Sequence, residues 1–223
     1  MNALTAYTNL KEAGQPVMQT GEVARRLNIP ESTALSLLGR LAGAGLITHV
    51  HHGLWAITPV SPLALPEHLT APFPSYVSFE TALFQHGMIE QIPPRVTVAS
   101  LGKPRIVRTS MGTFVIRQIQ PCLFGGFEYR DGARLATPEK ALFDTIYRAA
   151  HKGWNATYFP EIELPDQIDG AELDHWIDRI VSPKLRTMVT AILQEQNAPV
   201  SHKVPSRVSR RIRLGNKPVE RRR

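Results

Sequence analysis

Hydrophobic residues recur every three or four positions in two short segments near the start of the chain, which is the spacing of one face of an α-helix. In the first segment these residues are Val23, Ala24 and Leu27. In the second they are Leu35, Leu38, Leu41 and Ala42. The hydroxyl of Thr20 is expected to cap the first helix, and Asn28-Ile29-Pro30 ends it. The pattern predicts two short helices that pack against each other through these faces.

Two apolar runs around a turn follow the helices. Residues 46–50 and 54–57 predict β-strands joined by His51-His52-Gly53, and so a β-hairpin. An amphipathic helix over residues 2–14, with Leu4, Tyr7 and Leu10 on one face, would pack behind the helix pair. Two helices followed by a hairpin are typical of a winged helix-turn-helix, whose second helix enters the major groove of DNA. We therefore predict a DNA-binding domain over residues 1–58, with the hairpin as its wing.

The surface that would face DNA consists of the positions that the apolar stripes leave outward. The second helix would present Ser32, Thr33, Ser36 and Arg40 to the groove. Contacts to phosphate are expected from Thr20 and from Arg25 or Arg26. The wing would contribute His49, His51 and His52. Glu31 counts against a tight site because it would repel phosphate, and a plain protein–protein module is the alternative interpretation of the same helices and hairpin.

The rest of the chain divides into three parts. Prolines at positions 59, 62, 66, 72 and 74 predict a semi-rigid linker over residues 59–75. Residues 76–197 combine helical periods with strands over 95–100, 105–109 and 113–120, expected as an antiparallel sheet, and a hairpin around Asp131-Gly132. Helices are expected after Ser78, Thr137 and Ser182 and around Trp176. The predicted fold class is α+β: an N-terminal winged helix-turn-helix followed by an α+β domain with an antiparallel sheet and C-terminal helices.

The positive charge of the chain is concentrated at its end. The net charge is +7, yet residues 203–223 contain nine Lys/Arg and one acid, so the remainder sums to −1. Residues 198–223 are expected to be a basic, disordered tail, either merely solvated or a non-specific arm for DNA or RNA. The single Cys122 excludes an internal disulfide, and no signal peptide, anchor or membrane-spanning run is evident. A cytoplasmic protein is expected.

Sites for catalysis are weakly supported. His49, His51 and His52 lack a nearby acid or cysteine to complete a zinc site. Cys122 has no base beside it in sequence, so a small buried residue is expected rather than a nucleophile that would use His86 or His151. The adjacent Glu139 and Lys140, with Asp131 upstream, do not have the spacing of a nuclease strand. Phe124-Gly-Gly-Phe127 lacks the spacing of a phosphate-binding loop. We therefore expect no enzyme activity, no metal and no cofactor.

Three segments together resemble the AbiEi family, the antitoxins of type IV toxin-antitoxin systems. They are Gly45-Leu-Ile with His52-Gly-Leu-Trp-Ala-Ile57, Tyr76-Val-Ser-Phe-x-x-Ala-Leu-x-x-His-Gly87, and Leu135-Ala-Thr-Pro-Glu-Lys-Ala-Leu-Phe-Asp144. The resemblance covers about residues 1–195 and excludes the arginine-rich end. It implies a transcriptional autorepressor that binds inverted repeats in its own promoter. It also implies a C-terminal antitoxin domain that counteracts a nucleotidyltransferase-type toxin without requiring a stable complex.

The sequence therefore favours a DNA-binding repressor and antitoxin whose partners are promoter DNA and a nucleotidyltransferase-like toxin, with no membrane partner. Within the third segment, Glu139, Lys140 and Asp144 are the candidates for the antitoxin surface, because capping and packing explain the other positions. One alternative is a winged-helix regulator whose C-terminal domain senses a ligand or cleaves nucleic acid. Another is a scaffold that only binds other proteins.

Overall fold

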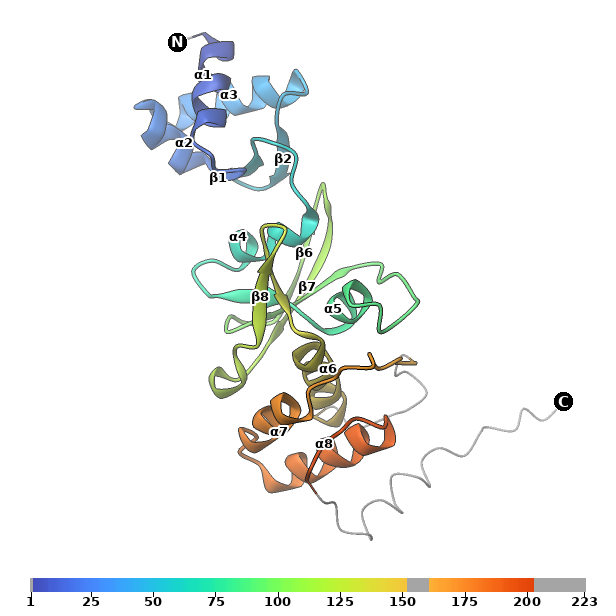
Figure 1. Cartoon of the computed structure of the whole chain (residues 1–223). Helices are drawn as coiled ribbons and strands as arrows, with labels where there is room; N and C mark the ends of the chain where they lie inside the picture. The colour runs from blue at the N-terminus through green and yellow to red at the C-terminus, as the bar shows by residue number, and fades with distance from the viewer. Residues whose placement is uncertain (1, 152–160, 203–223) are drawn as a thin grey trace, which may run out of the picture.

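The computed structural model describes residues 2–151 and 161–202. Figure 1 shows the N-terminal helices at one end, a larger sheet in the middle and the C-terminal helices at the other end. The fold is α+β, as predicted. The residues of the basic end, 203–223, lie outside the described part of the chain.

The N-terminal part contains three helices and a small antiparallel sheet. In chain order its elements are α1 (Ala3–Glu12), β1 (Val17–Gln19), α2 (Thr20–Leu27), α3 (Glu31–Gly43), β2 (Thr48–His51) and β3 (Leu54–Ala56). The strand order is β1-β3-β2, so β3 is the central strand. The three expected helices and the hairpin are confirmed, and β1 is an addition that its three residues did not signal.

Three details of these helices differ from the expectation. In α1 the buried residues are Ala6 and Leu10, whereas Leu4 is 63% exposed. The N-cap of α2 is Gln19, which forms a capping box with Glu22, and Thr20 is already helical. The buried stripe of α3 is Ala34, Leu37, Leu38 and Leu41, whereas Leu35 is 52% exposed. The stripe is rotated because α2 packs beside Ala34 and Leu38, and periodicity alone did not distinguish Leu35 from Leu37.

The proline-rich segment 59–75 contains short helices. These are η1 (Pro62–Ala64) and α4 (Pro66–Thr70), and Leu65 between them is fully buried. Proline at the first helical position is favourable because that residue has no intrahelical acceptor for an amide. The segment thus packs against the folded parts on either side of it.

The large sheet has six strands in the order β6-β7-β5-β4-β9-β8. Its strands are β4 (Ser75–Val77), β5 (Val96–Ser100), β6 (Arg105–Thr109), β7 (Gly112–Gln118), β8 (Phe127–Arg130) and β9 (Ala133–Ala136). The expected antiparallel sheet is wrong in one respect: β5 pairs parallel with β7, and β4 pairs parallel with β9, so the sheet is mixed. The β6–β7 hairpin places β7 between β5 and β6, which short-range alternation does not reveal.

Helices cover the sheet and close the far end of the molecule. They are α5 (Phe79–Gln85), α6 (Pro138–His151), α7 (Gly170–Asp178) and α8 (Pro183–Glu195), with η2 (Pro121–Leu123) before β8. The helix start predicted at Thr137 is confirmed, since its hydroxyl accepts the amide of Lys140 at 3.1 Å. The predicted turn at Asp131-Gly132 is confirmed too, with both residues at positive φ. Among the described residues, no helix combines the length and apolar character needed to cross a bilayer.

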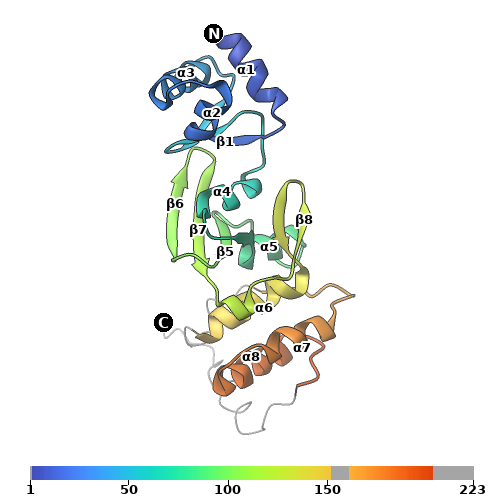
Figure 2. The ribbon, with the colours of Figure 1, turned by 90° about the vertical axis from the view of Figure 1, so that its left-hand side faces the viewer.

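The wing and the large sheet are in direct contact. The hydroxyl of Ser110, in the β6–β7 turn, donates to the carbonyl of His49 at 2.7 Å, and its amide donates to Val50 at 3.0 Å. A shared hydrophobic cluster joins Val50 and Leu54 of the wing to Phe114 of β7. In Figure 2 the β6–β7 hairpin reaches from the small sheet toward α6. The wing is therefore supported from behind by the second half of the chain.

Candidate nucleic-acid interface

The outward face of α3 carries the polar residues that were predicted for it. Ser32, Thr33, Ser36 and Arg40 are all exposed. The Ser36 hydroxyl donates to the carbonyl of Ser32 at 3.0 Å, a local bond that leaves its lone pairs free to accept. Exposed Leu35 lies among them. The four predicted side chains thus share one accessible helix face on a buried apolar support.

The residues predicted on α2 divide into two kinds. Arg25 is exposed, and Arg26, also exposed, donates through Nε to the carbonyl and side-chain oxygens of Asn9. Thr20, in contrast, is 6% exposed. Its hydroxyl accepts the indole N–H of Trp55 at 2.9 Å, so it stabilises the wing from inside rather than facing solvent. The side chain of Thr20 therefore packs on β3 and does not lie on the exposed surface from which its phosphate contact was predicted.

The wing histidines differ in their surroundings. The ring of His49 lies against the indole of Trp55, with 4.4 Å between the ring centroids. His51 and His52 are exposed at the turn, and the register of β2 and β3 shifts between His49 and His51. A bulge of this kind turns successive side chains out of strict alternation. All three histidines are exposed, and His49 in addition packs against Trp55.

A hollow of about 970 Å³ brings the helix and the wing together. It is lined by Ser32 and Leu35 of α3 and by all three wing histidines. The second half of the chain adds His68 from α4 and Arg105 from β6. These two were missed by sequence reasoning, because nothing near them in the chain indicates a place beside residues 32 and 49.

Electrostatics in this hollow are mixed. Arg105 donates to the carbonyl of Leu69 at 2.7 Å, which fixes its guanidinium near α4. Burial lowers the pKa of His68, while Glu22 and Glu67 oppose that shift. Glu31 also lines the hollow, so the repulsion of phosphate expected from its position applies here. Any duplex would have to approach with its backbone away from this carboxylate.

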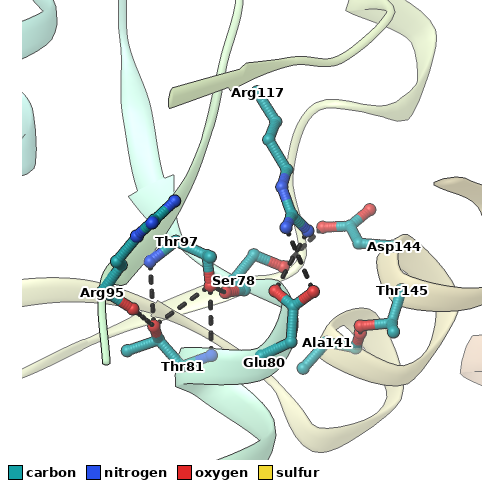
Figure 3. Close-up of polar contacts among 9 residues, drawn as sticks. All are labelled: Ser78, Glu80, Thr81, Arg95, Thr97, Arg117, Ala141, Asp144 and Thr145. Carbon is teal, nitrogen blue, oxygen red and sulfur yellow. Dashed lines mark hydrogen bonds and ion pairs between the residues drawn. The ribbon is translucent and has the colours of Figure 1, made fainter. Parts of the chain in front are cut away.

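Apart from the hollow at α3, a cluster of polar side chains is buried where α6 packs on the sheet. Lys140 and Asp144 are 0% and 1% exposed and form an ion pair along α6. Asp144 also accepts the hydroxyl of Tyr76 at 2.9 Å and that of Ser78 at 2.7 Å. Figure 3 shows Ser78 reaching Asp144 beside the Arg117–Glu80 ion pair. The N-cap predicted for Ser78 is in place, but its hydroxyl serves Asp144 and does not cap α5.

The same cluster continues toward α7 and three aromatic rings. The ammonium of Lys140 lies 4.3 Å from the Trp176 ring centroid and 4.9 Å from that of Phe143. Burial lowers the pKa of Lys140, and the charge of Asp144 counteracts this shift. Glu139, 7% exposed, accepts the amide of Asp169 at 2.8 Å before α7. Glu139 and Asp144 thus bond groups of other elements, whereas Lys140 pairs with Asp144 within α6 and lies over the ring of Trp176.

The expectation that Glu139, Lys140 and Asp144 form an exposed surface is therefore wrong. All three are buried because they join α6 to β4 and α7. The expectation for Cys122 is wrong in the opposite sense, since it is exposed in η2. Among residues 2–151 and 161–202, no group of three histidine, cysteine or acidic side chains is arranged to hold a metal.

The second and third segments of the family resemblance contact each other. Val77 pairs with Leu135 across β4 and β9, and Nε2 of His86 lies 2.7 Å from the carbonyl of Ala136. With the bonds to Asp144, these contacts make one interlocked unit from residues that lie far apart in the chain. No protein-family model matches the sequence, and no curated protein is similar to it above the threshold of significance.

Proposed function

We propose that the chain is a DNA-binding transcriptional repressor whose N-terminal part is a winged helix-turn-helix. The observation that carries the proposal is the exposed face of α3, which offers hydroxyls and one guanidinium beside an accessible hairpin. The element order helix, strand, helix, helix and hairpin supports it, with α2 and α3 packed as a helix-turn-helix pair. The rigid backing of α3 by Leu37, Leu38 and Leu41 favours a fixed docking geometry.

In this proposal α3 enters the major groove. Arg40 donates to a guanine edge, and Ser32, Thr33 and Ser36 read neighbouring edges or phosphates, since a hydroxyl both donates and accepts. Arg25 contacts the backbone, as do His49, His51 and His52 of the wing. Because the β6–β7 turn supports the wing, the second half of the chain sets how the wing meets the adjacent groove.

The test is operator binding by Arg40→Ala. Loss of a bidentate guanine contact is expected to weaken binding by about 1–3 kcal/mol, which is roughly 5- to 150-fold. The measurement is fluorescence anisotropy with the promoter fragment upstream of the gene, at fixed salt. The matched control is Arg130→Ala. Arg130 is an exposed arginine on β8, the edge strand of the large sheet opposite to β6. Equal affinities of the wild type and Arg40→Ala would remove Arg40 from base recognition, and equal losses in both variants would indicate general charge.

We further propose, from the family resemblance, that the chain is the antitoxin to a nucleotidyltransferase-type toxin. The segments that resemble the AbiEi family meet in the buried unit formed by Tyr76, Ser78 and Asp144, which supports a structural role for them. The antitoxin surface is therefore expected elsewhere on the second half of the chain. The Arg40→Ala variant also serves here. Coexpressed with the nucleotidyltransferase-like protein encoded beside the gene, it is expected to restore growth although it binds the operator poorly. Failure of the wild type to restore growth would end the antitoxin proposal and leave the repressor proposal standing.

A further inference from the structure

A second concave site lies at the end of β7 that is remote from the wing. It has a volume of about 310 Å³ and is lined by Phe79, Arg117, Gln120, Asp144, Tyr147 and Arg148, among others. Strand β7 begins beside the turn that contacts the wing (Figure 2), and its last residues, Arg117 and Gln118, line the cavity. The site shares no lining residue with the hollow at α3.

Arg117 is held rigidly at the wall of the cavity. Its side chain is 15% exposed and forms an ion pair with Glu80 at 3.0 Å (Figure 3). The guanidinium lies 4.7 Å from the centroid of the Phe79 ring. Its Nε is buried without a hydrogen-bond partner among the described residues. A buried N–H donor without an acceptor is costly, so this one indicates a missing acceptor.

Arg148 lines the same cavity and has no counter-ion of its own among the described residues. It is half-buried, and among the described residues it forms no hydrogen bond or ion pair. Burial lowers the pKa of its guanidinium, nearby Arg117 lowers it further, and Glu80 opposes both. Glu80 is already paired with Arg117, and Asp144 is paired with Lys140. Among the described residues, two guanidiniums therefore share one available carboxylate, which leaves one positive charge there without a partner.

The remaining wall suits a flat ring beside an anion. Tyr147 and His151 line this cavity, and with Gln120 they also line an adjoining hollow of about 600 Å³. Aromatic faces receive planar rings by stacking, and the amide of Gln120 both donates and accepts, as a base edge requires. Guanidinium is the side chain whose fork matches a phosphate. The combined space exceeds that of a bare inorganic ion.

We propose that this cavity binds a nucleoside monophosphate, with the guanidinium of Arg148 receiving the phosphate, the unpartnered Nε of Arg117 donating to it and Tyr147 contacting the base. This inference goes beyond the repressor and antitoxin roles and does not depend on either. The shared chemistry of an oxyanion and a planar ring defines the ligand class. The probes are the four ribonucleoside 5′-monophosphates, the matching nucleosides and inorganic phosphate. They separate recognition of the phosphate from recognition of the nucleoside.

The experiment is isothermal titration calorimetry of the full chain with each probe at 0.3 M salt, a condition that suppresses non-specific attraction by screening. At least one monophosphate is expected to bind with 1:1 stoichiometry, tenfold or more tighter than its nucleoside and than phosphate. Arg148→Ala is expected to weaken this binding at least tenfold, and Arg130→Ala to leave it unchanged. Arg148→Lys retains the charge and the stem but loses the fork, so a several-fold weakening is expected even if the alanine variant does not fold.

Three results would overturn the proposal. The first is no heat of binding for any monophosphate at millimolar concentration. The second is binding that Arg148→Ala and Arg148→Lys leave unchanged, which would assign the binding to another part of the chain. The third is equal affinity for the monophosphate and for phosphate alone, which would remove the ring from recognition.

Discussion

Removing Lys140 is expected to destabilise the protein more than most single substitutions, because it leaves the Asp144 carboxylate buried without its counter-ion. Both side chains are essentially inaccessible to solvent. Breaking a buried ion pair from one side typically costs about 3–5 kcal/mol. In Lys140→Met the two hydroxyls of Tyr76 and Ser78 still donate to Asp144, which favours the lower part of that range. The expected decrease in melting temperature is about 6–14 °C for a chain of this length.

The double variant Lys140→Met/Asp144→Asn separates charge burial from packing. The asparagine oxygen can still accept from Tyr76 and Ser78, while no charge remains inside. We therefore expect the double variant to recover about 2 kcal/mol or more relative to Lys140→Met, since replacing a whole buried pair is often close to neutral. Urea unfolding followed by circular dichroism at pH 7 measures the free energies of unfolding of the wild type, of Lys140→Met, of Asp144→Asn and of the double variant. If the two single changes simply add in the double variant, the reasoning about an uncompensated carboxylate is refuted.

Two further predictions concern the same region. Gly126→Ala is expected to lower the free energy of unfolding by about 2–4 kcal/mol, because φ is +67° and a Cβ would lie 2.7 Å from the Trp176 ring. Gly132→Ala, at φ +78° with no atom within 4 Å, is the matched control and should show only the backbone part, about 1–2 kcal/mol; equal losses in urea titrations would exclude the clash. Burial, and then the charge of Asp144, raise the pKa of Tyr76 well above 10.0, so the folded state keeps this proton longer than the unfolded state does. This contribution to stability is complete below pH 10 and is lost as the pH rises further, by up to about 1.4 kcal/mol per pH unit. The stability advantage of the wild type over Tyr76→Phe should therefore shrink between pH 10 and 11. Parallel curves of stability against pH for the two proteins would contradict this prediction.

Much of the secondary structure followed from local patterns. The helix start at Thr137-Pro138 and the turn at Asp131-Gly132 were predictable, because capping and positive φ are decided within a few residues. The choice between Leu35 and Leu37 on α3 was not, since both fit a helical period and only the position of α2 decides which one is buried. The outward face with Ser36 and Arg40 was nonetheless predicted correctly as exposed.

The sites depended more strongly on distant contacts. Glu139, Lys140 and Asp144 are charged residues, for which an exposed helix face is the ordinary expectation. Their burial follows from partners 66 and 68 residues away for Asp144 and 30 residues away for Glu139. Likewise, only the fold places Arg148 at the same cavity as Arg117, at the end of β7.

By itself the sequence determined the α+β composition, the order of helices and hairpins, and the polar face of α3, because each arises from periodicity and capping over a few neighbouring residues. Only the tertiary structure decided that β5 and β7 run parallel, that the β6–β7 turn supports the wing, and that an ion pair lies beneath α6. These features depend on strand pairing and burial between distant segments. The free energy of such a contact depends on a partner residue that is distant in the sequence, and a local pattern does not identify that residue.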